Sequence, residues 1–258
     1  MTDKPNAGSE NFLDLWLENL LVWRESPALA MGGCGVRQPS FAAADLGRGW
    51  SLFNSVTLLQ PLGSTVDSVL MEVADFYSPA RLGDILLWSP WSTPDLRPFG
   101  WRPYDKPWLM RRAAHAGFTP PTIELRVEEV HGADQLAEFL DVVAAAFPFD
   151  DLRESPHSWD MRVLSDPRIR CWLGRIAGVA VATSAAVVAG GVNGVTLVST
   201  LPVHRGKGIG ALMADHAARA EPALPAGLLA GDKPCPVYER LGFERLQRFT
   251  VWIRSRKT

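Results

Sequence analysis

A glycine-rich segment, Arg205-Gly206-Lys207-Gly208-Ile209-Gly210, has the residue types needed to hold a phosphate group. It lies between an uncharged, strand-like stretch over 195–201 and a helical stretch over 211–220. The first N–H groups of a helix have no partner inside the helix and lie at the positive end of its dipole. Glycine matters here because a Cβ would keep a phosphate away from those groups. The segment therefore predicts a site for a phosphorylated cofactor.

Two common phosphate motifs fit this segment poorly. A P-loop needs four residues between its glycines and then Gly-Lys-Ser/Thr, which the segment lacks. Gly206, Gly208 and Ala211 match the dinucleotide pattern G-x-G-x-x-G/A literally. That motif opens a domain and needs an acidic residue about 20 positions later, after a second parallel strand. Only 48 residues follow Gly210, too few to complete such a domain.

The stretch Leu201–Met213 resembles the acyl-CoA signature of the GNAT family of N-acetyltransferases. That signature is a strand, Pro, two variable residues, Arg/Gln-x-x-Gly-x-Gly/Ala and a helix. A second family signature resembles Val237-Tyr238-Glu239-Arg240-Leu241-Gly242-Phe243, at the expected separation. The resemblance covers about residues 121–258. It implies an α/β (α+β) GNAT fold, whose mixed, mostly antiparallel sheet is splayed between its fourth and fifth strands, flanked by helices, and holds acyl-CoA in the cleft.

The resemblance carries cofactor roles over by position. Backbone N–H groups from Arg205 to Ala211 would hold the pyrophosphate, and residues 198–201 would run beside the pantetheine. An N–H there, that of Leu201, would polarise the thioester carbonyl. The implied cofactor-binding residues are Val198, Ser199, Thr200, Leu201, Val203, Arg205, Gly206, Lys207, Gly208, Ile209, Gly210 and Ala211. The co-substrate is then acetyl-CoA, and no metal is implied.

Tyr238 is the catalytic candidate, because in the family the tyrosine at this position donates a proton to the departing CoA thiolate. A phenol with a pKa near 10 stays protonated at neutral pH and can do so. The alternative is a core tyrosine that packs the last helix. Arg205 and Lys207 lie at a helix start, where cations oppose the helix dipole, so an anionic ligand explains them better than solvation does. For Lys233 a surface role is the preferred interpretation.

A general base is not visible, because no carboxylate occurs from Ile176 through Leu212. Asp150, Asp151 and Glu154 lie where the family shapes its acceptor site, or else form a solvated acidic loop. The chain is therefore expected to be an acyl-CoA-dependent N-acyltransferase that acetylates an amine by direct attack. The alternative, a non-catalytic acyl-CoA-binding or regulatory module, needs no base.

The chain also resembles itself at an offset of 142 residues. Val66–Met71 falls on Gly208–Met213, and Phe99–Arg102 falls on Leu241–Glu244. Duplication explains this self-similarity, and chance matching of apolar positions is the alternative. The first copy has Gly63–Ser68 in place of the glycine loop, with Asp67 where a phosphate would sit. We expect a degenerate GNAT-like domain over 1–120 without a cofactor loop, a linker near 116–122, and the acyl-CoA-binding domain over 121–258.

The hydrophobic pattern predicts the elements of the second half. Helices are expected over 133–146, 155–164, 207–220 and 234–241. Strands are expected over 123–129, 170–173, 179–188, 195–201, 228–230 and 245–253. An uncharged run over 176–204 is long enough to cross a bilayer. Its glycine-rich centre is better explained by a β-hairpin that turns near Asn193-Gly194.

Composition and charge exclude several other classes of protein. The net charge is −2 and the pI about 6.2, so no global nucleic-acid footprint exists. Three cysteines lie far apart, which fits reduced thiols in a cytoplasmic protein and neither a disulfide framework nor a zinc site. We expect no membrane partner, a small-molecule or peptide amine as acceptor, and a monomer or homodimer.

Overall fold

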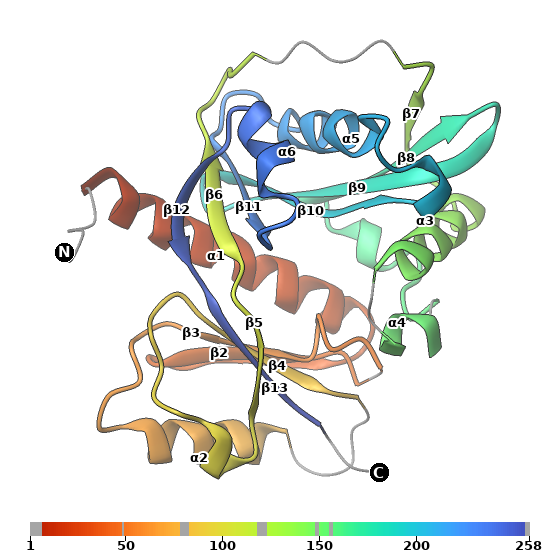
Figure 1. The fold of residues 1–258 in the computed structure, drawn as a ribbon. Helices are drawn as coiled ribbons and strands as arrows, with labels where there is room; N and C mark the ends of the chain where they lie inside the picture. The colour runs from red at the N-terminus through yellow and green to blue at the C-terminus, as the bar shows by residue number, and fades with distance from the viewer. Residues whose placement is uncertain are drawn as a thin grey trace.

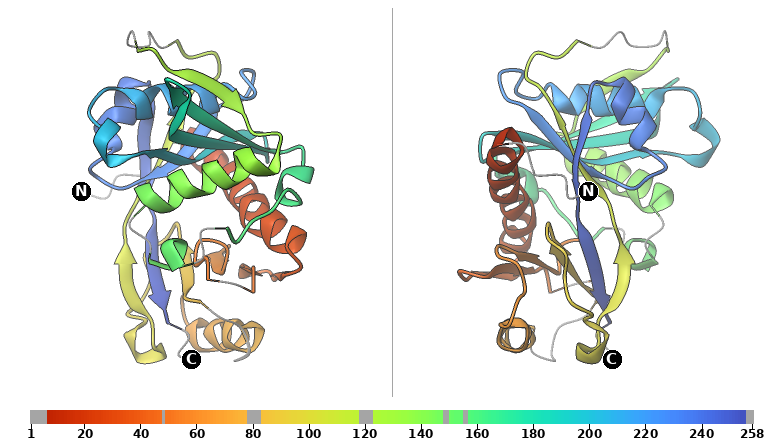
Figure 2. Two further views of the ribbon diagram at one scale, coloured as in Figure 1. Left: turned by 90° about the vertical axis from the view of Figure 1, so that its right-hand side faces the viewer. Right: turned by 60° about the vertical axis from the view of Figure 1, so that its left-hand side comes forward.

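Two mixed β-sheets, one above the other in Figure 1, organise the chain. The structure is a computed structural model and describes residues 7–47, 49–77, 83–117, 123–147, 150–154 and 157–255. Helix α1 lies between the two sheets, and further helices flank them (Figures 1 and 2). The predicted class, a mixed α/β fold of sheets flanked by helices, is confirmed.

The lower sheet has the strand order β1-β2-β3-β4-β13-β5. Its strands are β1 (Cys34–Arg37), β2 (Phe41–Asp45), β3 (Ser55–Leu58), β4 (Ile85–Ser89), β13 (Thr250–Arg254) and β5 (Arg102–Asp105). The pair β3–β4 is parallel and the other neighbours are antiparallel.

The upper sheet has the order β12-β6-β11-β10-β9-β8-β7. Its strands are β12 (Glu244–Arg248), β6 (Trp108–Arg112), β11 (Ala226–Ala230), β10 (Val192–Thr200), β9 (Val179–Ala189), β8 (Ile169–Ile176) and β7 (Arg126–Glu129). Again one pair, β10–β11, is parallel and the others are antiparallel.

Helix α1 supplies much of the core that the two sheets share. The helices are α1 (Ala7–Ala30), α2 (Val66–Phe76), α3 (Ala133–Ala146), α4 (Asp150–Glu154), α5 (Ile209–Ala218) and α6 (Cys235–Arg240), with short 3₁₀ helices at Arg97–Phe99, Val163–Ser165 and Pro202–His204. Helix α1 contacts β1 and β2 below and β9 and β10 above. Trp16, Leu20 and Trp23 of this helix are buried in one hydrophobic cluster with residues of both sheets. Burial of such large apolar side chains stabilises the joint between the sheets.

The two halves of the chain exchange one strand each. β6 comes from the first half of the chain but lies inside the upper sheet. β13, the last strand, comes from the second half but lies inside the lower sheet. Phe249, between β12 and β13, is fully buried, and its N–H donates to the carbonyl oxygen of Pro107 at 2.8 Å. The two crossing segments therefore touch where the chain passes between the sheets (Figure 1). A division of the chain at residue 120 therefore does not coincide with the division between the two sheets.

The offset of 142 residues also relates elements of the structure. It brings β5 onto β12, β6 onto β13 and the start of α2 close to that of α5. Leu109 pairs with Gln247 and Met110 with Arg245, and the offset converts these pairs into Val251–Asp105 and Trp252–Pro103. Both ladders have a bulge at the corresponding place, where the pairing register passes over Leu246 of β12 and Tyr104 of β5. The correspondence therefore extends to strand register.

Several predicted elements are confirmed, and others need correction. The helix over 133–146 has the predicted bounds, and β9 differs from its prediction by one residue. The strand predicted over 245–253 is two strands in different sheets, because the chain crosses at Phe249. Residues 157–162 are not helical, and Val163 and Leu164 belong to a short 3₁₀ helix, so the helix predicted over 155–164 is wrong except at its end where the structure describes it. Residues 118–122 of the predicted linker lie outside the described residues.

The hairpin turns at Gly190-Gly191, not at Asn193-Gly194, which lie inside β10. Gly194 is needed for packing instead, because a Cβ there would lie 2.1 Å from Oδ1 of Asn19 on α1. The Asn19 side chain donates from Nδ2 to the carbonyl oxygens of Val187, Ala189 and Val192 at 2.7, 3.0 and 2.9 Å. These bonds fix α1 to the hairpin.

Candidate functional site

The glycine loop forms a tight entry to α5. Gly206 and Gly208 have φ of 77° and 82°, in the region that L-residues other than glycine rarely adopt. Gly208 is the residue before the helix, and its carbonyl oxygen accepts hydrogen bonds from the N–H groups of Ala211 and Leu212. The N–H groups of Ile209 and Gly210, which come first in the helix, have no partner inside it, as an anion site requires. The N–H groups of Arg205 and Ala211, predicted to hold the pyrophosphate, instead donate to the carbonyl oxygens of Pro202 and Gly208 at 3.3 and 3.1 Å.

A groove of 790 Å³ runs along this loop, and we call it the loop groove. It has the size of a ligand site. Nine of the residues implied for the cofactor line it: Val198, Ser199, Thr200, Arg205, Gly206, Gly208, Ile209, Gly210 and Ala211. Leu201, Val203 and Lys207 were implied as well but do not line it. Val203 is 78% exposed on the outside of the loop.

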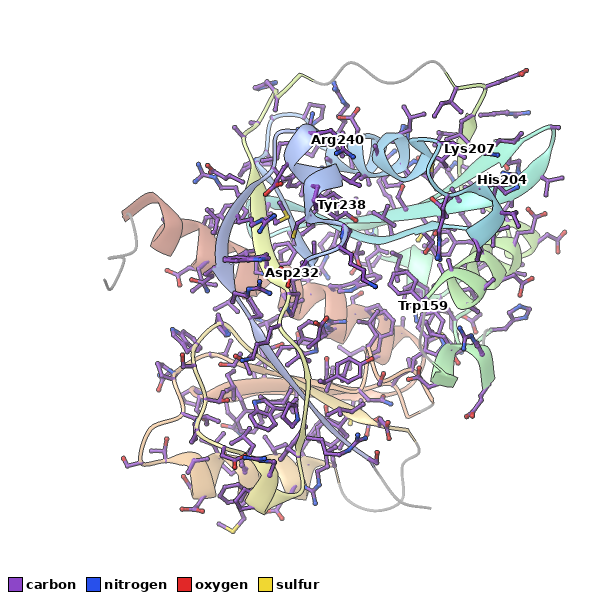
Figure 3. All side chains as sticks on the ribbon, viewed as in Figure 1. Trp159, His204, Lys207, Asp232, Tyr238 and Arg240 are labelled. Carbon is purple, nitrogen blue, oxygen red and sulfur yellow. The ribbon has the colours of Figure 1, made fainter. Side chains whose placement is uncertain are left out.

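The charged side chains among the described residues of the loop groove are all cationic: Arg205, Lys233 and Arg240. Lys233, interpreted from the sequence as a surface residue, lines the groove, and Arg240 was missed. Figure 3 shows Arg240 on α6 with Tyr238, and Lys207 and His204 at the other end of α5. Arg240 belongs to the second signature, so its place in that motif was a signal for it. The Arg205 guanidinium donates to the carbonyl oxygens of Thr200 and Ala146, at 3.0 and 2.9 Å.

The parallel strands β10 and β11 separate beside this groove. They pair only at Asn193–Ala226 and Gly194–Gly227, although they continue to Thr200 and Ala230. β10 bulges against β9, where Leu197 and Val198 together occupy the space opposite Ser184. Leu197 has a φ of 46°, a left-handed conformation that is strained for a bulky residue. A bulge disrupts the ladder and re-aims the backbone groups around it.

The expected role of the Leu201 N–H needs correction. This N–H donates to the carbonyl oxygen of Val181 at 2.9 Å and so belongs to the contact with β9. A donor already bonded within the sheet cannot polarise a ligand without losing that bond. The irregular backbone at Val198, in the bulge, is the better candidate, because it lines the groove and the cavity described next.

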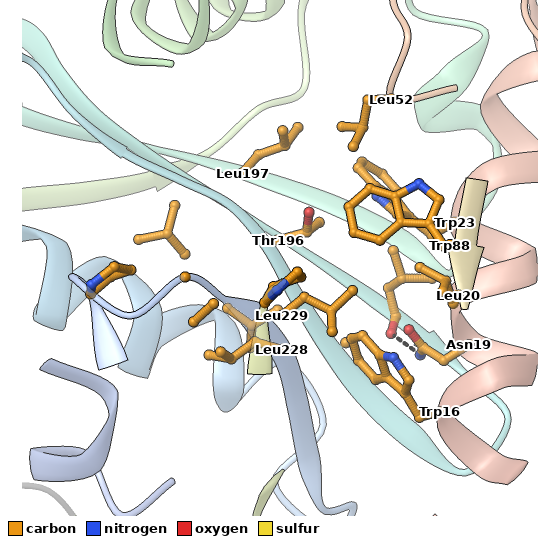
Figure 4. A pocket seen from close by; sticks show the side chains of 18 of the residues that line it. Trp16, Asn19, Leu20, Trp23, Leu52, Trp88, Thr196, Leu197, Leu228 and Leu229 are labelled. Carbon is orange, nitrogen blue, oxygen red and sulfur yellow. Dashed lines mark hydrogen bonds between the residues drawn. The ribbon is translucent and has the colours of Figure 1, made fainter. Parts of the chain in front are cut away.

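An inner cavity of 320 Å³ opens between the separated strands and α1 (Figure 4). Its walls are mainly apolar and include Trp16, Leu20, Trp23, Leu52, Trp88, Leu197, Leu228 and Leu229. Its described charged residues are Arg24 on α1 and Asp105 at the end of β5. Both sheets and α1 therefore contribute to one ligand-sized space.

Tyr238 lies in the wall of both the loop groove and the inner cavity, as do Phe147, Val198 and Pro234. Burial raises the pKa of Tyr238 to about 12, so the phenol stays protonated throughout the physiological range. Its ring packs edge-on against Phe243, with the ring centroids 6.0 Å apart. No hydrogen bond joins its hydroxyl to another described residue. The phenol is therefore a free donor at the junction of the two spaces.

The acidic residues considered from the sequence lie elsewhere. Asp151 accepts a hydrogen bond from the N–H of Ser51 at 2.6 Å, and Glu154 is exposed. Neither lines the groove or the cavity. The side chain of Asp150 lies outside the described residues. Within the described ranges, no cluster of His, Cys, Asp and Glu could hold a metal ion, and no helix is long and apolar enough to span a membrane.

Searches against protein-family models and curated protein sequences found no match. Solved structures do match. A GCN5-related N-acetyltransferase from Kribbella flavida is 19% identical, with a TM-score of 0.61 over 89% of this chain and 96% of its own. A protein of the GNAT family from Novosphingobium aromaticivorans is 17% identical, with a TM-score of 0.56 over 92% of this chain and 99% of its own. A conserved protein of unknown function from Staphylococcus epidermidis is 13% identical, with a TM-score of 0.62 over 87% and 95%. The chain therefore has the GNAT fold, as predicted.

Proposed function

We propose that this chain, with its GNAT fold, is an acyl-CoA-dependent N-acyltransferase that moves an acetyl group from acetyl-CoA to an amine. The observation that carries the proposal is the position of Tyr238, a protonated phenol in the wall of two connected spaces. The loop groove suits the phosphates and pantetheine of a CoA ester. The inner cavity suits the acceptor. Tyr238 lies at their junction, where the CoA thiolate would leave and would need a proton.

The residues of the loop groove fit acetyl-CoA, which when bound would supply an activated thioester. The first N–H groups of α5 would bind phosphate, supported by Lys233 and Arg240. The Val198 N–H would stabilise the negative charge that develops on the carbonyl oxygen. Tyr238 would give its proton to the departing sulfur.

Asp105 is the residue we propose to receive the proton of the amine. It is the one carboxylate among the described residues that line the inner cavity. Its Oδ1 accepts the N–H of Lys106 at 2.7 Å, and Oδ2 has no hydrogen-bond partner among the described residues. This oxygen can take a proton directly or through a water molecule. Sequence reasoning missed Asp105 because it belongs to the half of the chain that lacks the glycine loop.

The replacement Tyr238→Phe tests the enzymatic proposal. Removal of a general acid lowers the rate by about 10²–10⁴-fold. We expect kcat for acetyl transfer to fall at least about tenfold, while the Kd of CoA by calorimetry stays unchanged. Tyr104→Phe is the matched control, because Tyr104 also loses a hydroxyl but lies on β5 outside both spaces. An unchanged kcat in Tyr238→Phe would remove this residue from the mechanism.

A non-catalytic acyl-CoA-binding module is the second candidate. The absence of any carboxylate from residue 176 through residue 212 favours it, because a binding module needs no base. Such a module would bind CoA through the loop groove and acetylate no amine in a broad panel. Transfer to any amine, lost in Tyr238→Phe, excludes the module.

We also propose that the first half is a degenerate copy of the second and has become part of the acceptor site. The shared strand register at the offset of 142 residues supports this, as does Asp67, which would put negative charge where the loop of the second half would bind a phosphate. Trp16, Trp23 and Trp88 of this half line the inner cavity. The cofactor is then bound by one half and the acceptor enclosed by both.

A further inference from the structure

The inner cavity has a cation in its wall whose charge no described residue balances. Arg24 lies on α1 and is only 4% exposed. Its Nη1 donates to the carbonyl oxygen of Leu52 at 2.6 Å, and its guanidinium stacks over the Trp88 ring at 4.8 Å. Its Nε has no acceptor, and no ion pair joins it to a carboxylate in the described part of the chain.

Two further donors in the same wall lack an acceptor among the described residues. The indole Nε1 atoms of Trp16 and Trp88 are buried and unpaired. Both residues line the cavity (Figure 4). Buried polar groups in proteins are nearly always hydrogen-bonded, so three unpaired donors around one cavity need an explanation. A ligand rich in acceptor atoms would provide it.

A buried charge without a partner destabilises the folded state by itself. Burial lowers the pKa of the Arg24 guanidinium to about 9, so the group still carries its charge at neutral pH. A planar guanidinium matches a carboxylate geometrically, and the charged hydrogen bonds between them are about twice as strong as neutral ones. A bound carboxylate would therefore balance the charge of the buried guanidinium.

Resting on the proposed function, we propose that the acceptor is an amine that also carries a carboxylate and a large apolar side chain, and that Arg24 binds the carboxylate. The tryptophan and leucine walls would hold the apolar side chain. Asp105, the other charged lining residue, would receive the ammonium end. Tyr238 and Val198 lie in the same cavity wall, so the amine can face the junction with the loop groove. This composition describes an amino acid such as leucine, phenylalanine or tryptophan.

Acetylation of these three amino acids, compared with their amides and their decarboxylated amines, tests the inference. In the wild-type protein we expect kcat/KM for the acids to exceed that for the amides. In Arg24→Met the value for the acids should fall at least about tenfold through KM, because a charged hydrogen bond is lost. The values for the amides should change less than about threefold.

Stability provides a readout that a purely structural arginine would not reproduce. Methionine has a similar length and removes the unpaired charge, so Arg24→Met should keep its Tm within about 3 °C of wild type or raise it. Arg24→Lys keeps the charge but not the planar pair of donors of the guanidinium. Its affinity for acids should therefore lie between those of Arg24→Met and the wild type. Arg97→Met is the control, because this arginine lies on the surface away from the cavity.

Calorimetry separates this inference from the proposed function. Binding of the free amino acids, weakened in Arg24→Met, supports the carboxylate site even if no acetyl transfer occurs. Transfer to amines without a carboxylate at equal efficiency supports the enzyme and overturns the carboxylate site. The inference is also wrong if no acid binds the wild-type protein, or if Arg24→Met weakens acids and amides equally.

Discussion

Gly208 satisfies two demands at one position. Its φ of 82° turns the chain into α5, and its small size leaves the first helical N–H groups open to a ligand. The first demand occurs at many turns, but the second occurs only where a ligand approaches. A substitution at Gly208 should therefore have two separable consequences, one for stability and one for binding.

Gly208→Val tests the binding role against Gly178→Val, which serves as a matched control. Gly178 has a φ of 84° in the turn between β8 and β9 and a Cβ there would meet nothing within 4 Å. Each substitution strains the backbone by about 1–3 kcal/mol, so both should lower Tm similarly. Only Gly208→Val should weaken CoA binding, by at least about tenfold in calorimetry. Equal CoA affinity of Gly208→Val and the wild type would contradict the site.

At the scale of residues, the sequence supports prediction where a motif fixes the geometry. The glycine loop and Tyr238 lie within contiguous signatures, so their positions follow from local spacing. Arg24 and Asp105 belong to no motif and reach the cavity only because α1 and β5 pack against the opposite half. No local pattern indicates such contacts, since they depend on the tertiary arrangement.

At the scale of elements, a buried ion pair joins β6 to α5. Arg112 on β6 is 3% exposed, and its Nη1 donates to Oδ1 of Asp215 at 2.7 Å. Arg219, the residue that follows α5, donates to the other oxygen at 2.8 Å. The pair connects the strand supplied by the first half to the helix that begins at the glycine loop. It holds that helix against the sheet.

Arg112→Met should destabilise the protein strongly, because Asp215 would remain buried with only its outer partner. Breaking a buried pair costs about 3–5 kcal/mol. We expect the low end of that range because Arg219 stays, and a Tm lower by about 6–12 °C. Arg111→Met is the control. Its partner Glu244 is 59% exposed, and such pairs contribute about 0–1 kcal/mol. Thermal unfolding followed by circular dichroism compares the two, and equal Tm values would refute this role of Arg112.

The errors at this scale have a common physical cause. Periodicity predicts α3 and β9 well because α3 buries one face of its helix and β9 buries the middle of its length between two neighbouring strands. Asn193-Gly194 looks like a turn because glycine often marks one. Its glycine instead makes room for Asn19, which lies far away in the sequence. Likewise, the strand-like sequence over 245–253 has no turn residue that would indicate the change of sheet at Phe249.

At the scale of the whole molecule, the exchange of β6 and β13 makes the two sheets interdependent. Each exchanged strand lies between two partners, so its removal leaves two strands with unpaired edges. Val251, Trp252 and Ile253 of β13 are at most 8% exposed. Helix α1 adds a core that belongs to both sheets. The inner cavity, which lies between them, therefore depends on the integrity of both halves.

Truncation after Arg248 tests this interdependence, because it deletes β13, which lies between β4 and β5 in the lower sheet. Loss of its strand pairing and of four buried apolar side chains, the three of β13 and that of Phe249, each contributing about 1.5–3 kcal/mol, should remove most of the stability of such a protein. Truncation after Ser255 is the control, since it leaves β13 intact. Hydrogen exchange should show lost protection in β4 and β5 and also in α1 and the upper strands it contacts. If the upper sheet keeps full protection, the halves are independent, and the inner cavity does not depend on the exchange of strands.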